Sequence, residues 1–179
     1  MNRAVSIDIE TMGKSPTAAI TSIGAVMFDP HGDWVGKDFH VHVSLDSAME
    51  NGLTVDAETL LWWMAQSDEA RGVLVAGQTI SFTLHGALLK LFDYIPQDAE
   101  IWANGASFDF AILANAYRAA DCGPTPWKYY KERCLRTLKG INPDLRIERE
   151  GVHHNALDDA RHQARLIQYI LQANRDTQS

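Results

Sequence analysis

The segment Ala4-Val5-Ser6-Ile7-Asp8-Ile9-Glu10 lies near the start of the chain, and apolar and polar residues alternate in it. Alternation of this kind predicts a β-strand with Val5, Ile7 and Ile9 on one face, and Asp8 and Glu10 side by side on the other. A lone Asp-x-Glu is most simply explained as a solvated pair on an edge strand. Here the flanking residues are apolar and the strand is expected to be central, and acids are rarely buried there without a partner or a metal. The pair is therefore a candidate ligand set.

The residues that follow extend this strand into an antiparallel meander. Residues 20–28 predict a second strand, residues 29–33 form the turn sequence Asp-Pro-His-Gly-Asp, and residues 38–43 alternate again. Beyond the meander, the pattern predicts helices over residues 56–66, 81–95, 108–120 and 156–173, and a short buried strand over residues 101–103. Strands followed by helices that alternate with strands predict a single α/β domain over residues 1–179, with a central mixed sheet of the antiparallel meander plus parallel strands, flanked by helices.

Composition narrows the class of protein. A chain of 179 residues that is 46% apolar and 22% charged is ordinary for a globular protein, and no apolar run is long enough to span a bilayer. Cleavage of a signal peptide would remove Asp8, and the two cysteines lack zinc-type spacing, so we expect a cytoplasmic protein with reduced thiols. The net charge of −7 argues against a protein that coats nucleic acid through a basic surface, but not against a nuclease whose acids hold metal.

Further acids and a histidine occur at two other places. Asp109 follows the strand over residues 101–103 and begins a helix, where an acid also suits the helix dipole. His154 and Asp159 lie at the start of the last helix, although His153 and Asp158 share the same spacing. Four carboxylates brought together repel one another unless cations lie between them, and a histidine can move a proton near neutral pH. Metal-assisted hydrolysis of a phosphodiester is the chemistry that this set predicts.

Together these segments resemble a known family. Residues Ser6 to Gly13, Ser22-Ile23-Gly24-Ala25-Val26, Asn104 to Asp109 and His154-Asn155-Ala156-Leu157-Asp158-Asp159-Ala160 are similar to the motifs of the DEDD-type 3′→5′ exonucleases that use a histidine base (DEDDh). Ribonuclease T, oligoribonuclease and proofreading subunits belong to that group. In it the histidine is followed by x-Ala and the last aspartate precedes an alanine, which selects His154 and Asp159. The stretch Trp62 to Arg71 resembles the prophage exonuclease VIII-like branch more loosely.

The resemblance implies a fold and an activity. The fold would be ribonuclease H-like, with two Mg²⁺ or Mn²⁺ ions held by Asp8, Glu10, Asp109 and Asp159, and with His154 as the general base. The activity would be the stepwise release of 5′-mononucleotides from the free 3′ end of single-stranded RNA or DNA. Relatives are often homodimers, and the sequence does not decide whether this chain is one. It also does not separate RNA from DNA, since no reader of the 2′-hydroxyl is recognisable.

Several residues are candidates for substrate binding. Thr11, Met12 and Gly13 would border the terminal nucleotide, with Met12 wedged against a base and Phe108 stacked on one. Core packing explains Met12 and Phe108 equally well, and Asn104 either binds substrate or shapes the turn. The adjacent Trp62 and Trp63 cannot share a helix face, so we expect one in the core and the other exposed. The most basic stretch contains Lys128, Lys131, Arg133, Arg136 and Lys139. These side chains either bind the phosphates along a nucleic-acid backbone or form a solvated surface.

Other functions remain to be weighed against this one. A hydrolase of very short oligonucleotides would use the same chemistry and is not separable by sequence. A non-catalytic nucleic-acid-binding module would have lost a ligand or the base, whereas all five residues are present. A cofactor-binding α/β protein would need a glycine-rich loop after the first strand, where Gly13 stands alone.

Overall fold

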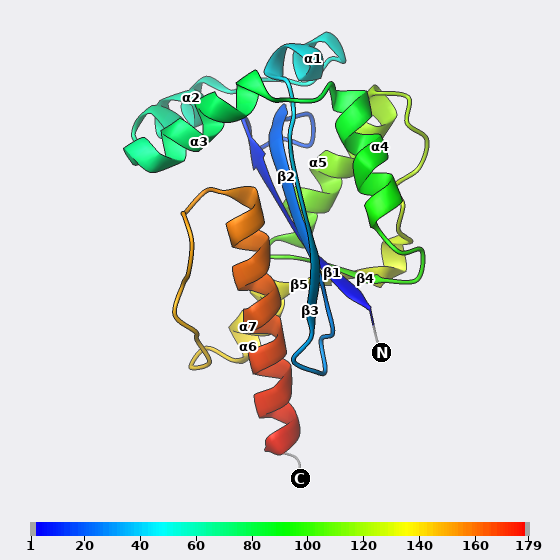
Figure 1. The fold of residues 1–179 in the computed structure, drawn as a ribbon, viewed down its shortest axis with the longest axis vertical. Helices are drawn as coiled ribbons and strands as arrows, with labels where there is room; N and C mark the ends of the chain where they lie inside the picture. Colours follow the sequence, from blue (N-terminus) through cyan, green and yellow to red (C-terminus); the bar gives the residue numbers. More distant parts are fainter. Residues whose placement is uncertain (1–2, 178–179) are drawn as a thin grey trace.

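The computed structural model describes residues 3–177, which form a mixed five-stranded sheet with helices on both faces (Figure 1). Across the sheet the strands are β3 (Val35–His42), β2 (Ile20–Phe28), β1 (Ala4–Thr11), β4 (Glu100–Ala103) and β5 (Glu132–Cys134). The first three strands form an antiparallel meander, and β4 and β5 run parallel to β1. The predicted α/β class, mixed sheet and meander are confirmed.

Seven α-helices and one short 3-10 helix are found among residues 3–177. They are α1 (Leu45–Glu50), α2 (Ala57–Met64), α3 (Asp68–Thr79), α4 (Leu84–Tyr94), α5 (Ala106–Ala119), η1 (Tyr129–Lys131), α6 (Leu135–Ile141) and α7 (Ala156–Asp176). The sequence did not indicate α1, α3, α6 or β5. In α3 the two internal glycines weaken the helical pattern, but Gly77 is needed for packing, since a Cβ there would lie 2.2 Å from Nδ1 of His42.

The two faces of β1 pack against different helices. Val5, Ile7 and Ile9 belong to a core cluster that includes the buried residues of α4 and α5. The opposite face, which carries Asp8 and Glu10, is covered by α7 and α6 through a second cluster that includes Leu135, Ile167 and Ile170. Because β1 is the third of five strands, its two acids lie on a central strand beneath a helix and not on an exposed edge.

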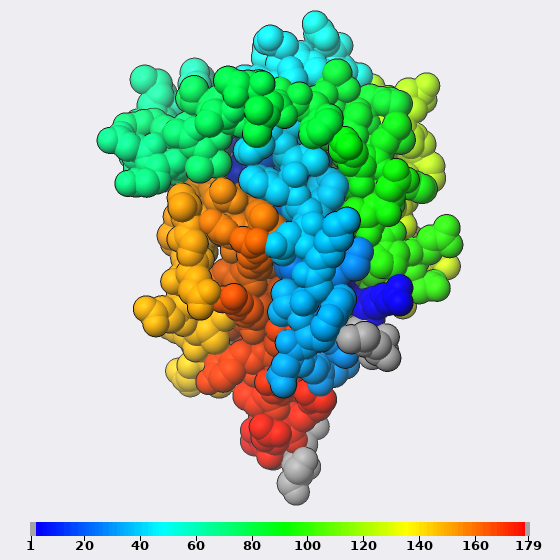
Figure 2. All heavy atoms as spheres, in the orientation of Figure 1, coloured from blue at the N-terminus to red at the C-terminus, as the bar shows by residue number. Residues whose placement is uncertain are grey.

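Contact between α7 and the sheet depends on Gly24. This residue pairs with Asp8 across the β1–β2 ladder. A Cβ at Gly24 would lie 2.1 Å from the carbonyl carbon of Ala156, so only glycine lets the first turn of α7 rest on the strand. Asn155 caps that turn, because its side chain accepts hydrogen bonds from the backbone N–H groups of Leu157 and Asp158. Figure 2 shows the start of α7, in orange, directly below the α2–α3 pair.

None of the helices formed by residues 3–177 has the length and apolar character needed to cross a membrane. Both cysteines, Cys122 and Cys134, are free thiols.

Candidate active site

A cavity of about 370 Å³ opens where β1 and β4 end and α7 begins. Its walls include all five residues predicted to be catalytic, namely Asp8, Glu10, Asp109, His154 and Asp159. They come from three distant parts of the chain, which the parallel pairing of β1 with β4 and the close approach of α7 to β2 bring together. The structure therefore gathers in one place the segments that the sequence presents separately.

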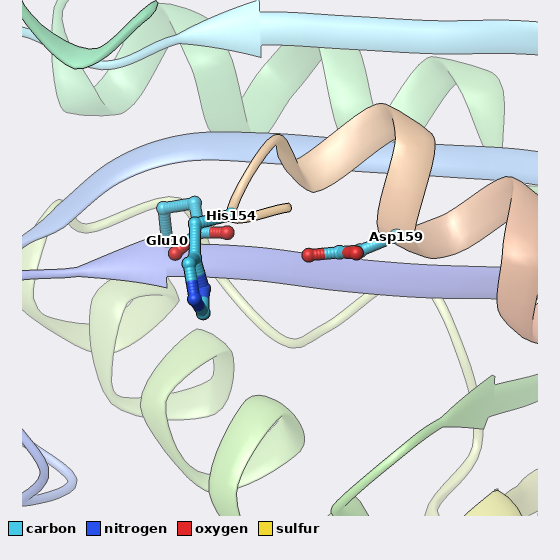
Figure 3. A group of neighbouring side chains, drawn as sticks. All are labelled: Glu10, His154 and Asp159. Carbon is cyan, nitrogen blue, oxygen red and sulfur yellow. The ribbon is translucent and has the colours of Figure 1, made fainter. Parts of the chain in front are cut away.

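Three of these residues are close enough to share one ion. Ligand atoms of Glu10, His154 and Asp159 all lie within 4.8 Å of one another. Figure 3 shows Glu10 projecting from β1 beside His154, which lies just before α7, while Asp159 projects from the first turns of that helix. His154 has a backbone φ of +62°, a left-handed conformation that turns the chain immediately before the helix cap.

The geometry distinguishes the two candidate His/Asp pairs. Asp158 accepts hydrogen bonds from the backbone N–H of Val152 at 2.9 Å and from Arg161 at 3.2 Å. It faces a separate polar cavity behind the loop and does not line the catalytic one. Both His153 and His154 line the catalytic cavity. Of the two, His154 is the one whose imidazole nitrogen lies within 4.8 Å of carboxylate oxygens of Glu10 and Asp159. These contacts favour His154 and Asp159.

Asp8 accepts a hydrogen bond from α7, and Asp109 is almost fully buried. The side-chain amide of Gln163 donates a 2.7 Å hydrogen bond to Oδ1 of Asp8. Asp109 is only 4% exposed and lies in the first turn of α5. Gln163 was not among the residues predicted from the sequence, although a helical pattern could have found it. It follows Asp159 by four residues on α7, so the two side chains share one face of that helix.

The carboxyl groups resist ionisation in this environment. Burial, with added repulsion from Asp109 and Glu10, raises the pKa of Asp8 well above its usual range. Burial and the charge of Asp109 raise the pKa of Glu10 to about 8. Burial likewise raises the pKa of Asp109 to about 7, against the opposing effect of backbone hydrogen bonds and Arg136. Acids with such raised pKa values are typical of a site that binds cations between them.

Arg149 supplies positive charge to the same cavity. Its guanidinium forms an ion pair with Asp159, and its charge lowers the pKa values of Asp8 and Glu10. Burial, followed by the charges of His153 and Arg149, lowers the pKa of His154, so its imidazole is neutral at pH 7. Arg149 lies in the irregular stretch before α7, and no sequence pattern pointed to it.

A second, mainly apolar cavity of about 290 Å³ adjoins the first, with Ile9, Glu10 and Phe108 lining both. Thr11 and Gly13 also line it, as does the exposed Trp62. Met12 does not line either cavity, because it is 5% exposed and belongs to the core cluster under β1. Of the two roles that the sequence left open for Met12, the structure shows the packing role, with the side chain in the core.

Asn104 lines the first cavity and also shapes the turn after β4. Its backbone oxygen accepts from the N–H of Arg136 at 3.2 Å, and its side-chain oxygen lies 3.4 Å from Nζ of Lys139. Arg136 and Lys139 of α6 line the same wall, so part of the basic stretch is at the site and not on a remote surface.

The chain matches a described family over almost its whole length. Residues 3–171 match the 3′-5′ exoribonuclease Rv2179c-like domain. The chain belongs to this family. An exodeoxyribonuclease of Enterobacteria phage T4 is similar to this chain, at 31% identity over 125 residues, which cover 63% of this chain and 54% of the relative. These matches confirm the resemblance to the DEDD-type 3′→5′ exonucleases.

Solved structures show the same fold. Escherichia coli Exonuclease I in complex with a dT13 oligonucleotide superimposes with a TM-score of 0.69 at 12% identity, covering 99% of this chain and 43% of that chain. The zinc-bound form of the Exonuclease I complex with single-stranded DNA gives 0.71 at 12% identity, covering 98% and 41%. The chain thus spans about half the length, or less, of these relatives.

Proposed function

We propose that the protein is a metal-dependent 3′→5′ exonuclease that releases 5′-mononucleotides from single-stranded nucleic acid. The observation that carries this proposal is the convergence of four carboxylates and one histidine in a single cavity. Family membership supports the 3′→5′ direction of degradation, since the family is described as a 3′-5′ exoribonuclease domain.

The residues present suit divalent metal ions. Asp8, Glu10, Asp109 and Asp159 offer the hard oxygen ligands that Mg²⁺ and Mn²⁺ prefer, and the pKa values of the first three are raised mainly by burial, with mutual repulsion added at Asp8 and Glu10, so a bound cation would favour their charged forms. In the proposal these four side chains hold two ions. When bound, such ions activate water and stabilise the charge that develops on the phosphodiester.

His154 is the proposed general base. Its imidazole is neutral at pH 7 and lies among the ligand atoms of Glu10 and Asp159, so it can take a proton from water at that point. The N-cap of α7 and the left-handed turn at His154 bring its backbone to the edge of the cavity. Gln163 keeps the carboxylate of Asp8 oriented by donating to it.

The two adjoining cavities suit the two parts of a 3′ end. The apolar cavity, lined by Thr11, Gly13 and Phe108, would take the terminal nucleoside. Arg136 and Lys139 line the other side of the carboxylates and would face the phosphate backbone. A base must leave its duplex partner to enter an apolar pocket, which supports a single-stranded substrate.

Product analysis tests the proposal. Linear and circular single strands of RNA and of DNA would be incubated with Mg²⁺ or Mn²⁺, and the products separated by chromatography. We expect 5′-mononucleotides from the linear strands and no product from the circles. Cleavage of the circles, or release of 3′-mononucleotides, would refute the proposal. A series of lengths from two nucleotides upward tests whether the natural substrate is a very short oligonucleotide.

Two further parts of the proposal concern the whole protein. A cytoplasmic location fits the two free thiols, which persist in a reducing compartment. The homodimer common among relatives is tested by light scattering of the purified protein.

A further inference from the structure

The imidazole of His154 lies against two tryptophans of α2. Its ring centroid is 4.8 Å from that of Trp62 and 6.0 Å from that of Trp63, and both pairs are edge-to-face, with interplanar angles of 83° and 76°. The two indoles also contact each other edge-to-face at 5.2 Å. Edge-to-face packing at these distances is favourable and depends on orientation.

α2 is fixed to the strand that carries Glu10. The indole N–H of Trp63 donates a 2.9 Å hydrogen bond to the backbone oxygen of Thr11, and Trp63 is only 3% exposed. At the start of the helix, the N–H of Asp56 donates to the oxygen of Met12 at 2.7 Å. The position of Trp62 is therefore tied to the end of β1, one residue beyond Glu10.

His154 itself has little local support. It lies near the end of an irregular stretch from residue 142 to residue 155, which contains neither helix nor strand. Within residues 3–177, no hydrogen bond to its imidazole is found, so ring packing is the main contact that can set the orientation of the imidazole. Trp62 is 43% exposed and lines the apolar cavity, so its contacts with His154 and Trp63 lie at the edge of the site and not in the core.

We infer that Trp62 is a positioning residue, which holds the imidazole of His154 in the orientation needed to accept a proton beside Glu10. The inference rests on the proposed function, because it assigns the means by which the proposed base is oriented. Trp62 also borders the apolar cavity, so its loss raises KM as well, and only the effect on kcat reports the positioning.

A kinetic cycle tests this role. The variants are Trp62→Ala, Trp62→Phe, His154→Ala and the double variant, with Leu61→Ala as the matched control. Leu61 is the neighbouring residue on α2, is 66% exposed and lines neither cavity. Misplacing a catalytic group by about 1 Å can cost about 100-fold in rate, so Trp62→Ala should lower kcat by about 10- to 100-fold. Trp62→Phe should recover most of that loss, and Leu61→Ala should match the wild type.

The His154→Ala background gives the decisive comparison. If Trp62 acts through His154, the double variant should have the kcat of His154→Ala alone, because the two changes remove one interaction. The inference would be overturned if adding Trp62→Ala to His154→Ala lowered kcat by the same factor as it does in the wild type. An unchanged kcat in Trp62→Ala would overturn it as well.

A second readout does not depend on activity. In the wild-type protein with Mg²⁺ and ¹³C-labelled histidine, the ring protons of His154 should show a ring-current shift, with the resonance assigned by His154→Asn. The shift should become clearly smaller in Trp62→Ala, where only the more distant Trp63 ring remains, and should be unchanged in Leu61→Ala. Absence of the shift in the wild type would overturn the inference. If the shift is present but the wild type cleaves no nucleic acid, the proposed function fails, and the positioning role fails with it.

Discussion

Replacing Gly24 with alanine should slow turnover although it changes no catalytic side chain. The new Cβ would lie 2.1 Å from the carbonyl carbon of Ala156, whereas ordinary van der Waals contacts begin at 3.4 Å. The start of α7 and β2 must therefore separate by the difference, about 1.3 Å. This movement carries His154 and Asp159 away from Glu10.

The size of the effect follows from that displacement. A shift of about 1 Å at a catalytic group can cost about 100-fold in rate, so kcat should fall by about two orders of magnitude. Forcing an extra methyl group into a packed contact also destabilises the fold, by about 1–3 kcal/mol. The contact is between backbone atoms on both sides, so no side chain can rotate to relieve it.

The assay compares hydrolysis of a labelled oligonucleotide and thermal unfolding for Gly24→Ala and Gly72→Ala. Gly72 lies in α3, and among residues 3–177 no atom outside its chain neighbours and the adjacent backbone of its own helix comes within 4 Å of the place that a Cβ would take there. Alanine at this position should leave activity unchanged and stabilise the helix by roughly 0.5–1 kcal/mol. If Gly24→Ala matched the wild type in both turnover and melting temperature, docking of α7 through this glycine would be refuted.

Three further outcomes are expected. Because burial holds the pKa values of Glu10 (about 8) and Asp109 (about 7) above those of the unfolded chain, these groups bind more protons when folded. In EDTA, the melting temperature of the wild type relative to that of Glu10→Gln should therefore fall as pH rises from about 5 to 8, a comparison that cancels the titration of the histidines. Saturating Mg²⁺ should flatten that fall, and a relative melting temperature that rises over the same range would contradict it. Gln163→Leu removes the hydrogen bond that lowers the pKa of Asp8, so calorimetry at pH 7 should show metal affinity weakened by about tenfold, while an unchanged affinity would mean that the bond does not matter. Lys139→Gln should raise KM for a long strand and reduce the salt dependence of KM, with kcat preserved, and an unaltered salt dependence would remove Lys139 from the backbone path.

The sequence predicted the parts of the fold that depend on local patterns. The alternation in β1 identified both its buried face and the acids on the other face, because strand period and burial agree there. The helical stripe in α4 and the final helix were evident for the same reason. By contrast, α3 and α6 contain glycines and few core residues, so their helical pattern is weak although tertiary contacts stabilise them.

The sequence predicted the motif residues of the candidate site, but it did not predict the residues that contact them. Arg149 reaches Asp159 from an irregular stretch, and no periodicity marks such a residue. The contact between Trp62 and His154 joins residues that are far apart in sequence, and it depends on where α2 and the α7 loop lie in the fold. For Met12 the sequence left core packing and a base contact equally open, because its neighbours line the apolar cavity while its own side chain lies in the core.

The most direct test of the central claim is a gel assay of 5′-labelled single-stranded RNA and DNA of equal sequence with Mg²⁺ or Mn²⁺. The controls are EDTA and the His154→Ala protein, whose metal binding is measured separately. We expect a ladder that shortens from the 3′ end, lost in EDTA and strongly reduced in His154→Ala although that protein still binds metal. Wild-type turnover in His154→Ala, or no ladder on either strand with metal bound, would contradict the claim.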